Sequence, residues 1–251
     1  MHNVSSHVWA FFLIVSGMIC CSSEPRPVSS KLTSSTPDRF IAYTVDPALG
    51  NLKMYWKDPK GQRYAMLGNL VDQLAAKGQK VNFAMNGGMF RADGTPQGLF
   101  IESGTLTTPL DTVEEAYGNF YLQPNGIFYL THDHRAVVCQ RSEFPGHEGI
   151  EYATQSGPML VIQGKIHPAF REGSSNVHFR NGVGILPDGK VLFAISSEEV
   201  NLWDFAQFFR SNGCENALYL DGFVSRMYAP AKNWEQRDGK FGVIIAEVNE
   251  M

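Results

Sequence analysis

The sequence has little of what marks several large classes of protein. Its formal net charge is −4, and the 21 Lys and Arg residues are scattered rather than gathered into a run. Nucleic acid is therefore not an expected partner, and no basic patch for a polyanion is expected. Cysteine is also scarce, because the chain has four and no two are spaced as C-x-x-C. The absence of that spacing excludes a zinc ribbon and a dithiol redox motif.

Two of the four cysteines, Cys139 and Cys214, lie far apart in the body of the chain. In an exported protein they could form a disulfide, and two separate buried thiols fit the same spacing equally well. The sequence leaves both alternatives open.

The N-terminal residues differ in character from the rest. Residues 8–21 read VWAFFLIVSGMICC, an apolar run that is shorter than the about 20 residues of a membrane span and typical of a signal peptide core. We expect residues 1–22 to be a signal peptide or a lipoprotein signal, with an uncleaved anchor as the alternative. Acylation of Cys20 or Cys21 would tether the protein to a membrane. The expected location is the periplasm, or a membrane face for an anchored lipoprotein.

A stretch rich in Ser, Thr and Pro separates this segment from the body of the chain. Residues 23–37 lack periodic apolar spacing, so we expect a flexible tether. The remaining residues, 38–251, contain no break in composition and no internal repeat. Their number suits one domain with a sizeable core.

Short apolar or alternating runs separated by turn residues dominate the body of the chain and predict β-strands. These runs occupy residues 40–45, 52–56, 81–85, 98–103, 119–123, 126–130, 136–140, 158–162, 182–186, 191–196, 217–221 and 241–248. Two segments have helical spacing instead: Leu67 to Leu74, with Gly78 as a stop, and residues 201–213. We therefore expect an α+β fold, a single domain with a large, mainly antiparallel or mixed sheet and a few helices.

Polar residues repeatedly flank the predicted core strands. In AMNGGMF (84–90), two glycines would let the backbone approach an anion closely, although a tight turn is the alternative. In NALYLDGFVSRMY (216–228), an apolar strand ends on a carboxylate that a rigid strand could aim at a ligand or that could cap a turn. The candidate residues of this kind are Asn86, Gly87, Gly88, Gln155, Ser156, Gly157, Arg180, Asn181, Asp221, Gly222 and Ser225.

Together these residues include the side-chain types needed to bind a phosphate and to transfer a proton. A guanidinium matches phosphate oxygens bidentately, and a carboxylate can exchange a proton during hydrolysis. A metal site is less well supported. His132 and His134 in THDHR (131–135) share one face of a strand without a third ligand in view, which favours a hairpin turn over a metal site.

Five stretches, in order along about residues 40–248, resemble the phosphodiester glycosidase family, which includes the N-acetylglucosamine-1-phosphodiester alpha-N-acetylglucosaminidase domain. They are AMNGGMF, YGNFYLQPNGIFYL, ATQSGPMLVIQGKIHPAF, RNGVGILPDGKVLFAIS, and DFAQFFR with ALYLDG. The family's Asn-Gly-Gly-x-Phe loop is matched from Asn86 to Phe90, and its Arg before a Gly-containing strand by Arg180. Its Leu-Asp-Gly-Gly-x-Ser loop is matched from Leu220 to Ser225. Phe223 replaces the second glycine, and we expect its ring to narrow the approach to the backbone.

The resemblance implies hydrolysis of a sugar-1-phosphodiester, which releases the sugar from a phosphorylated acceptor. Asp221 would act as acid, base or nucleophile, and Glu102 would be the second carboxylate that glycosyl transfer normally needs. Arg180 and the backbone amides of Asn86 to Gly88 would hold phosphate oxygens. The remaining substrate-binding candidates are Gln155, Ser156, Gly157, Asn181, Gly222 and Ser225.

Two other functions remain open on the same residues. A non-catalytic envelope protein could bind carbohydrate through Phe90, Phe223 and Tyr228 as stacking platforms, and a metal-dependent phosphodiesterase would need a cation. The expected partner is a glycosyl phosphodiester or an envelope glycan. No cofactor is certain, and a divalent cation remains an option.

Overall fold

The computed structural model describes residues 2, 38–221 and 223–251. The predicted export signal apart from residue 2, the predicted tether and Gly222 lie outside these residues. Within the described ranges, no helix is both long enough and apolar enough to cross a membrane. All the elements described below belong to one unit, residues 37–251.

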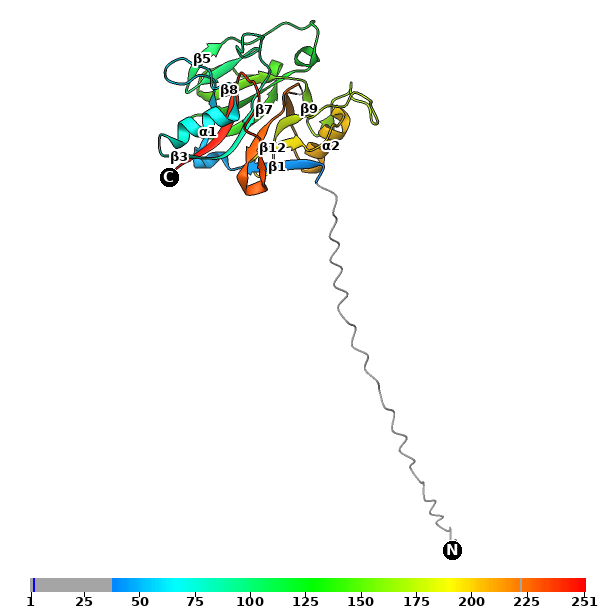
Figure 1. Ribbon diagram of the computed structural model, residues 1–251. Coiled ribbons are helices and arrows are strands. Elements are labelled where there is room, and N and C mark those ends of the chain that lie inside the picture. Colours follow the sequence, from blue (N-terminus) through cyan, green and yellow to red (C-terminus); the bar gives the residue numbers. More distant parts are fainter. Residues whose placement is uncertain (1, 3–37, 222) are drawn as a thin grey trace. The chain divides into compact units, whose positions relative to one another are not determined.

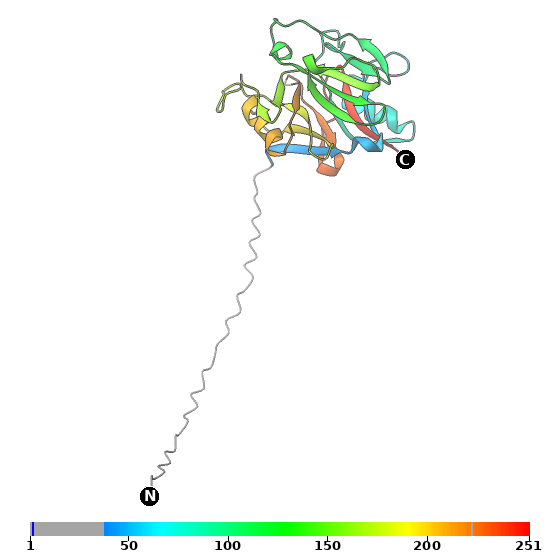
Figure 2. The same ribbon diagram turned by 180° about the vertical axis from the view of Figure 1, so that it is seen from behind.

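The described strands assemble into three sheets (Figures 1 and 2), and their neighbouring strands pair antiparallel. The first sheet has the order β1 (Phe40–Val45), β12 (Val191–Ser196), β11 (Asn181–Ile185), β13 (Ala217–Asp221), β9 (Met159–Ile162) and β10 (Lys165–Ile166). The second has the order β15 (Trp234–Glu235), β14 (Met227–Ala229), β3 (Gln79–Asn86), β16 (Ile244–Glu250) and β2 (Leu52–Tyr55). The third has the order β5 (Thr105–Thr108), β4 (Phe100–Glu102), β8 (Ile150–Ser156), β6 (Gly126–Thr131) and β7 (Ala136–Gln140).

Two α-helices lie on opposite sides of this unit (Figures 1 and 2). Helix α1 (Leu67–Ala75) buries its leucines against the second sheet. Helix α2 (Leu202–Ser211) packs on the first sheet, and the Asn201 side chain caps it by accepting from the Asp204 N–H at 2.8 Å. Short 3₁₀ turns complete the described elements: η1 (Pro47–Leu49), η2 (Asn119–Tyr121), η3 (Arg141–Glu143) and η4 (Pro230–Lys232).

The central core draws side chains from all three sheets. Phe193 of β12 packs on Phe83 of β3 and on Phe128 of β6, with ring centroids 4.8 and 5.9 Å apart. Strand β13 is buried on both faces, because Leu218 and Leu220 face this core while its alternate residues face α2. A strand covered on both sides reads as an unbroken apolar run, which explains the sequence ALYL before Asp221.

Most of the predicted strands and both helices are confirmed, but the predicted single large sheet is divided into three. Residues 119–123 were predicted as a strand, and this prediction is wrong. The segment contains η2, in which the N–H groups of Tyr121 and Leu122 bond back to Gly118 and Asn119. The alternating pattern gives no information about whether a partner strand is available. No strand pairs with this segment within the described residues, so its backbone N–H groups bond to nearby carbonyl groups instead. The whole of β8, which the sequence pattern missed, lies at the centre of the third sheet.

The two described cysteines are free and buried in different places. Cys139 lies in the apolar cluster on the outer side of the third sheet, and Cys214 lies in the cluster beneath α2. Of the two alternatives that the sequence left open, the structure has separate buried thiols. Burial raises the pKa of each thiol to about 12.

These two thiols are expected to resist alkylation in the folded protein. At pH 8 their thiolate fractions are very small, and both side chains are covered. Without reductant, iodoacetamide should leave the Cys139 and Cys214 peptides unmodified in native protein and modify both after unfolding in guanidinium, as read by mass spectrometry. Peptides that remain unmodified in guanidinium until a reductant is added would instead indicate a disulfide.

Candidate functional site

Three of the predicted site residues meet where strands of two sheets end. Asn86 is the last residue of β3, Asn181 is the first of β11, and Asp221 is the last of β13. Asn181 and Asp221 are paired across β11 and β13, with a register shift immediately afterwards. Such bulges redirect side chains next to functional sites. The three side chains are almost fully buried, Asp221 at 5 % exposure and both asparagines at 0 %.

Hydrogen bonds between the two asparagines fix the position of Asp221. The Asn181 side-chain amide donates to the backbone oxygen and to Oδ1 of Asn86, both at 2.9 Å, and its Oδ1 accepts from the Asp221 N–H at 2.9 Å. Asn86 Oδ1 also accepts from the Arg226 N–H at 2.9 Å, while its Nδ2 lies 3.5 Å from Asp221 Oδ2. The amides predicted to bind substrate are therefore used within the protein, where they orient the carboxylate.

Asp221 also organises the loop that follows it. Its Oδ1 accepts from the Phe223 N–H at 2.9 Å, and its backbone oxygen accepts from Ser225 Oγ at 2.7 Å. This is the turn-capping role that the sequence offered as an alternative. One carboxylate oxygen thus holds the turn while the other faces Asn86, so capping and aiming the carboxylate are compatible.

The two glycines after Asn86 are required by packing. A Cβ at Gly87 would lie 2.5 Å from Ile245 Cγ1, and one at Gly88 would lie 2.6 Å from Thr154 Oγ1. The Gly87 N–H donates to the Val243 oxygen at 2.9 Å, so it is not directed at a ligand. The anion-binding nest expected at this loop is therefore not formed by the Gly87 amide.

Arg180, which the sequence suggested as a phosphate-binding residue, is completely buried. Its Nε donates to the Val200 oxygen at 2.7 Å, Nη1 to Tyr219 Oη at 2.9 Å, and Nη2 to the backbone and side-chain oxygens of Asn176, both at 2.9 Å. Burial raises the pKa of Tyr219 above its ordinary value, which keeps this phenol neutral. Arg180 therefore joins the loop before β11 and the segment before α2 to the strand that carries Asp221.

Strand β8 contributes residues that fix loops around the site. Gln155 Oε1 accepts from the N–H groups of Leu99 and Asp111 at 3.0 and 2.9 Å, and Ser156 Oγ donates to the Leu220 oxygen at 2.8 Å. A Cβ at Gly157 would lie 2.7 Å from Asn125 Cβ. The Gln155 and Ser156 side chains thus make internal hydrogen bonds, and Ser156 holds the end of the third sheet to β13.

Glu102 is not brought to this cluster. Its neighbour Ile101 pairs with Ala153, three residues before Ser156 on β8, a separation of about 10 Å at about 3.3 Å per residue. Glu102 accepts from the Trp56 N–H at 3.3 Å, and burial raises its pKa. The structure therefore does not pair Glu102 with Asp221, because antiparallel register carries β4 away from the end of β13.

Exposed aromatic rings flank the Asp221 loop. Phe223 is 96 % exposed and Phe179 is 48 % exposed. Their loops are adjacent, because Ser225 Oγ donates to the Phe179 oxygen at 3.2 Å. The Phe223 ring projects into solvent, so it does not fill the space beside the backbone as the sequence suggested. Phe179 was missed, since a single aromatic residue between polar neighbours gives no distinctive pattern.

The described residues contain no group of three or more His, Cys, Asp or Glu side chains arranged to hold a metal ion. His132 and His134 lie at the turn between β6 and β7, as predicted. His132 pairs with Glu151 at 2.5 Å, far along β8 from Ser156.

Comparisons with known proteins agree with this fold. The sequence profile of the phosphodiester glycosidase family matches residues 79–245. The uncharacterized protein YigE of Escherichia coli (strain K12) is 37 % identical over 188 residues, which cover 74 % of this chain and 73 % of that protein. The zebrafish N-acetylglucosamine-1-phosphodiester alpha-N-acetylglucosaminidase catalytic domain, auto-inhibited by its pro-peptide, has a similar fold with a TM-score of 0.55. That match has 15 % identity and covers 85 % of this chain and 84 % of the zebrafish chain.

Substitution of Asn181 is expected to destabilise the meeting point of the strands. Asn181→Ala removes the acceptor of the Asp221 N–H and the donor to Asn86, and leaving buried groups unpaired costs about 1–3 kcal/mol. Urea unfolding followed by circular dichroism should show this loss in the free energy of unfolding. The matched control is Asn119→Ala, at an exposed position, where a change within about 0.5 kcal/mol is expected. Equal losses at both positions would contradict a special role for Asn181.

Proposed function

The chain belongs to the phosphodiester glycosidase family, and on that basis we propose that it is an exported hydrolase of sugar-1-phosphodiesters. The products would be the free sugar and a phosphomonoester. This proposal is supported above all by the Asp221 carboxylate, which a buried amide network holds at the junction of two sheets. Rigid elements of this kind are well suited to holding a catalytic group.

The chemistry of the leaving group can account for a site in which Glu102 does not join Asp221. Most glycosidases need an acid to protonate a poorly stabilised alkoxide, in addition to a base or nucleophile. A departing phosphomonoester carries its charge over several oxygens, and its second pKa is about 6. It therefore leaves without a proton at neutral pH. The absence of Glu102 from the site is consistent with this requirement.

We assign Asp221 the role of general base. Its carboxylate takes a proton from water, the water oxygen bonds to the anomeric carbon, and the bond from that carbon to the phosphate oxygen breaks. The electron pair stays with the phosphomonoester, and the proton later returns to solvent. The Asn86 amide, 3.5 Å from Asp221 Oδ2, orients the carboxylate for this step.

The rings of Phe179 and Phe223 would supply contacts to the sugar. Aromatic faces pack against the apolar face of a pyranose, and both rings border the loop that begins at Asp221. The zebrafish relative is a glycosidase of N-acetylglucosamine-1-phosphodiesters by its name, so this sugar is the first substrate to test. The apolar run at residues 8–21 supports export to the periplasm, or to a membrane face through Cys20 or Cys21.

Replacing Asp221 should abolish most of the proposed activity. With the full chain and an N-acetylglucosamine-1-phosphodiester, Asp221→Asn should lower kcat by about 10²–10⁴-fold, the usual contribution of general base catalysis. Asp188→Asn, in the exposed hairpin between β11 and β12, is the control and should retain full activity. Water labelled with ¹⁸O should deliver its oxygen to the sugar.

The same assay separates the alternatives. Label in the phosphate would contradict attack at the anomeric carbon, and wild-type activity in Asp221→Asn would contradict the assigned base. Loss of activity with a chelator would favour the metal-dependent phosphodiesterase. Saturable glycan binding without product would favour the carbohydrate-binding protein.

The aromatic rings should affect substrate binding more than the chemical step. Phe223→Ala is expected to raise KM about threefold to tenfold, which corresponds to about 0.5–1.5 kcal/mol of ring contact, with little change in kcat. Phe223→Trp should restore KM. Leu49→Ala, another exposed apolar position at 70 % exposure, should change neither parameter. An unchanged KM in both Phe223→Ala and Phe179→Ala would remove the rings from the proposed site.

A further inference from the structure

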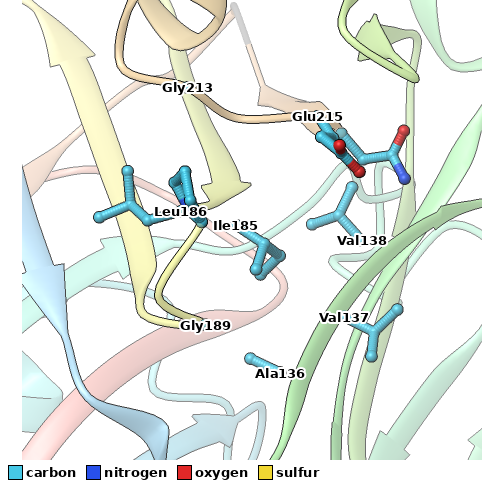
Figure 3. Close-up of a pocket in the computed structure, with 10 residues that line it drawn as sticks. Ala136, Val137, Val138, Ile185, Leu186, Gly189, Gly213 and Glu215 are labelled. Atoms are coloured by element: carbon cyan, nitrogen blue, oxygen red, sulfur yellow. The ribbon is translucent and has the colours of Figure 1, made fainter.

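A cavity lies between β7 and the segment that follows β11 (Figure 3). It has a volume of about 530 Å³, within the size range of ligand sites. Ile185, at the far end of β11 from Asn181, forms part of its wall. The five residues of β11 separate the two sites by about 13 Å at about 3.3 Å per residue. A ligand in this cavity would therefore not occupy the Asp221 site.

One wall of the cavity is the free edge of a sheet. Strand β7 is the last strand of the third sheet and pairs with β6 alone. Arg141 N–H donates to the Asn125 oxygen and Thr131 N–H to the Arg135 oxygen. In an antiparallel pair, hydrogen-bonded and non-hydrogen-bonded residues alternate. Odd-numbered residues of β7 therefore bond to β6, and the N–H and C=O groups of the even-numbered residues point away from it.

The outward-pointing groups of Ala136 and Val138 are directed to this cavity. Both residues line it, and Figure 3 shows them across from Ile185 and Leu186. Across the described residues, neither makes a backbone hydrogen bond on that side of β7. The next outward N–H, that of Gln140, donates to a Glu143 carboxylate oxygen at 3.2 Å. The side chain of Glu143 thus ends the free edge after two residues.

The remaining walls carry apolar side chains, the Asn216 amide and one acidic group. Ile185, Leu186 and Pro187 form an apolar side, and Glu215 lies at one end of the cavity. In the part of the chain that the structure describes, the Glu215 carboxylate has no ion pair. The cavity therefore combines backbone donors and acceptors at strand spacing, an apolar wall and an unpaired negative charge.

We propose that this cavity binds an extended polypeptide segment that adds a strand to β7. A peptide backbone matches the N–H and C=O groups of Ala136 and Val138, whereas an apolar small molecule would leave them unpaired. Alternate side chains of the bound segment should be apolar, to face Ile185 and Leu186, and a basic side chain should lie beside Glu215.

The test uses the full chain and a defined probe. The probe is a fluorescent, terminally blocked octapeptide in which valine alternates with lysine and threonine, and its binding is followed by fluorescence anisotropy. The control probe has the same sequence with its central backbone nitrogens methylated, which removes the donors for the edge of β7. We expect saturable binding of the first probe and at least tenfold weaker binding of the second.

Substitutions at one position isolate the backbone donor. Ala136→Pro removes the outward N–H, which edge strands tolerate, and should weaken binding about tenfold. Ala136→Gly keeps the N–H and should bind within about twofold of wild type, because the donor is unchanged. Glu215→Gln should weaken binding of the lysine-containing probe about threefold and reduce its dependence on salt. Circular dichroism of each variant verifies its fold.

Amide hydrogen exchange locates the bound strand independently of these variants. The N–H groups of Ala136 and Val138 should exchange at least tenfold more slowly with saturating probe. Absent binding, equal binding of the methylated probe, or unchanged exchange at these two amides would each overturn the proposal. So would a concentration-dependent dimer that protects the same amides without peptide, since the occupant would then be a second copy.

Discussion

The junction of Asn86, Asn181 and Asp221 is the constraint on which the organisation of this protein depends. It joins strand ends of the first and second sheets, and Ser156 ties the third sheet to the same place through the Leu220 oxygen. Buried polar groups are tolerated only when hydrogen-bonded, so each side chain must satisfy its neighbours. The arrangement that satisfies them also fixes the direction of one carboxylate, which connects the architecture to the proposed chemistry.

Of the two carboxylates predicted for the site, the structure places Asp221 at the junction and Glu102 away from it. Arg180, Gln155 and the asparagines form a supporting shell of internal hydrogen bonds around the junction, rather than a set of free groups that face the substrate. Such a shell limits side-chain motion at the reacting group. Under the proposed function, a second carboxylate is not needed as an acid, because a phosphomonoester leaving group spreads its negative charge over several oxygens when the bond breaks.

Much of the fold could be predicted from local patterns. The hairpin at Pro187, the turn at His134 and the helix containing Leu70 follow from turn chemistry and periodicity. Division into three sheets could not be predicted, because strand partners are chosen by burial against distant segments. The alternation of apolar and polar residues around Tyr121 predicted a strand for the same reason. Such a pattern indicates the direction of each side chain, but it does not indicate whether another strand is available to pair with.

The sequence by itself determined which polar residues flank core strands, and Asp221, Asn86 and Asn181 were among its candidates. Only the tertiary structure decided their roles, because hydrogen-bond partners depend on residues up to 140 positions apart, as in the bond from Arg226 to Asn86. It buried Arg180 and moved Glu102 away from Asp221 through the register of β4 and β8. The local sequence pattern indicates which side chains lie at the ends of core strands, whereas long-range packing determines which groups each of them contacts.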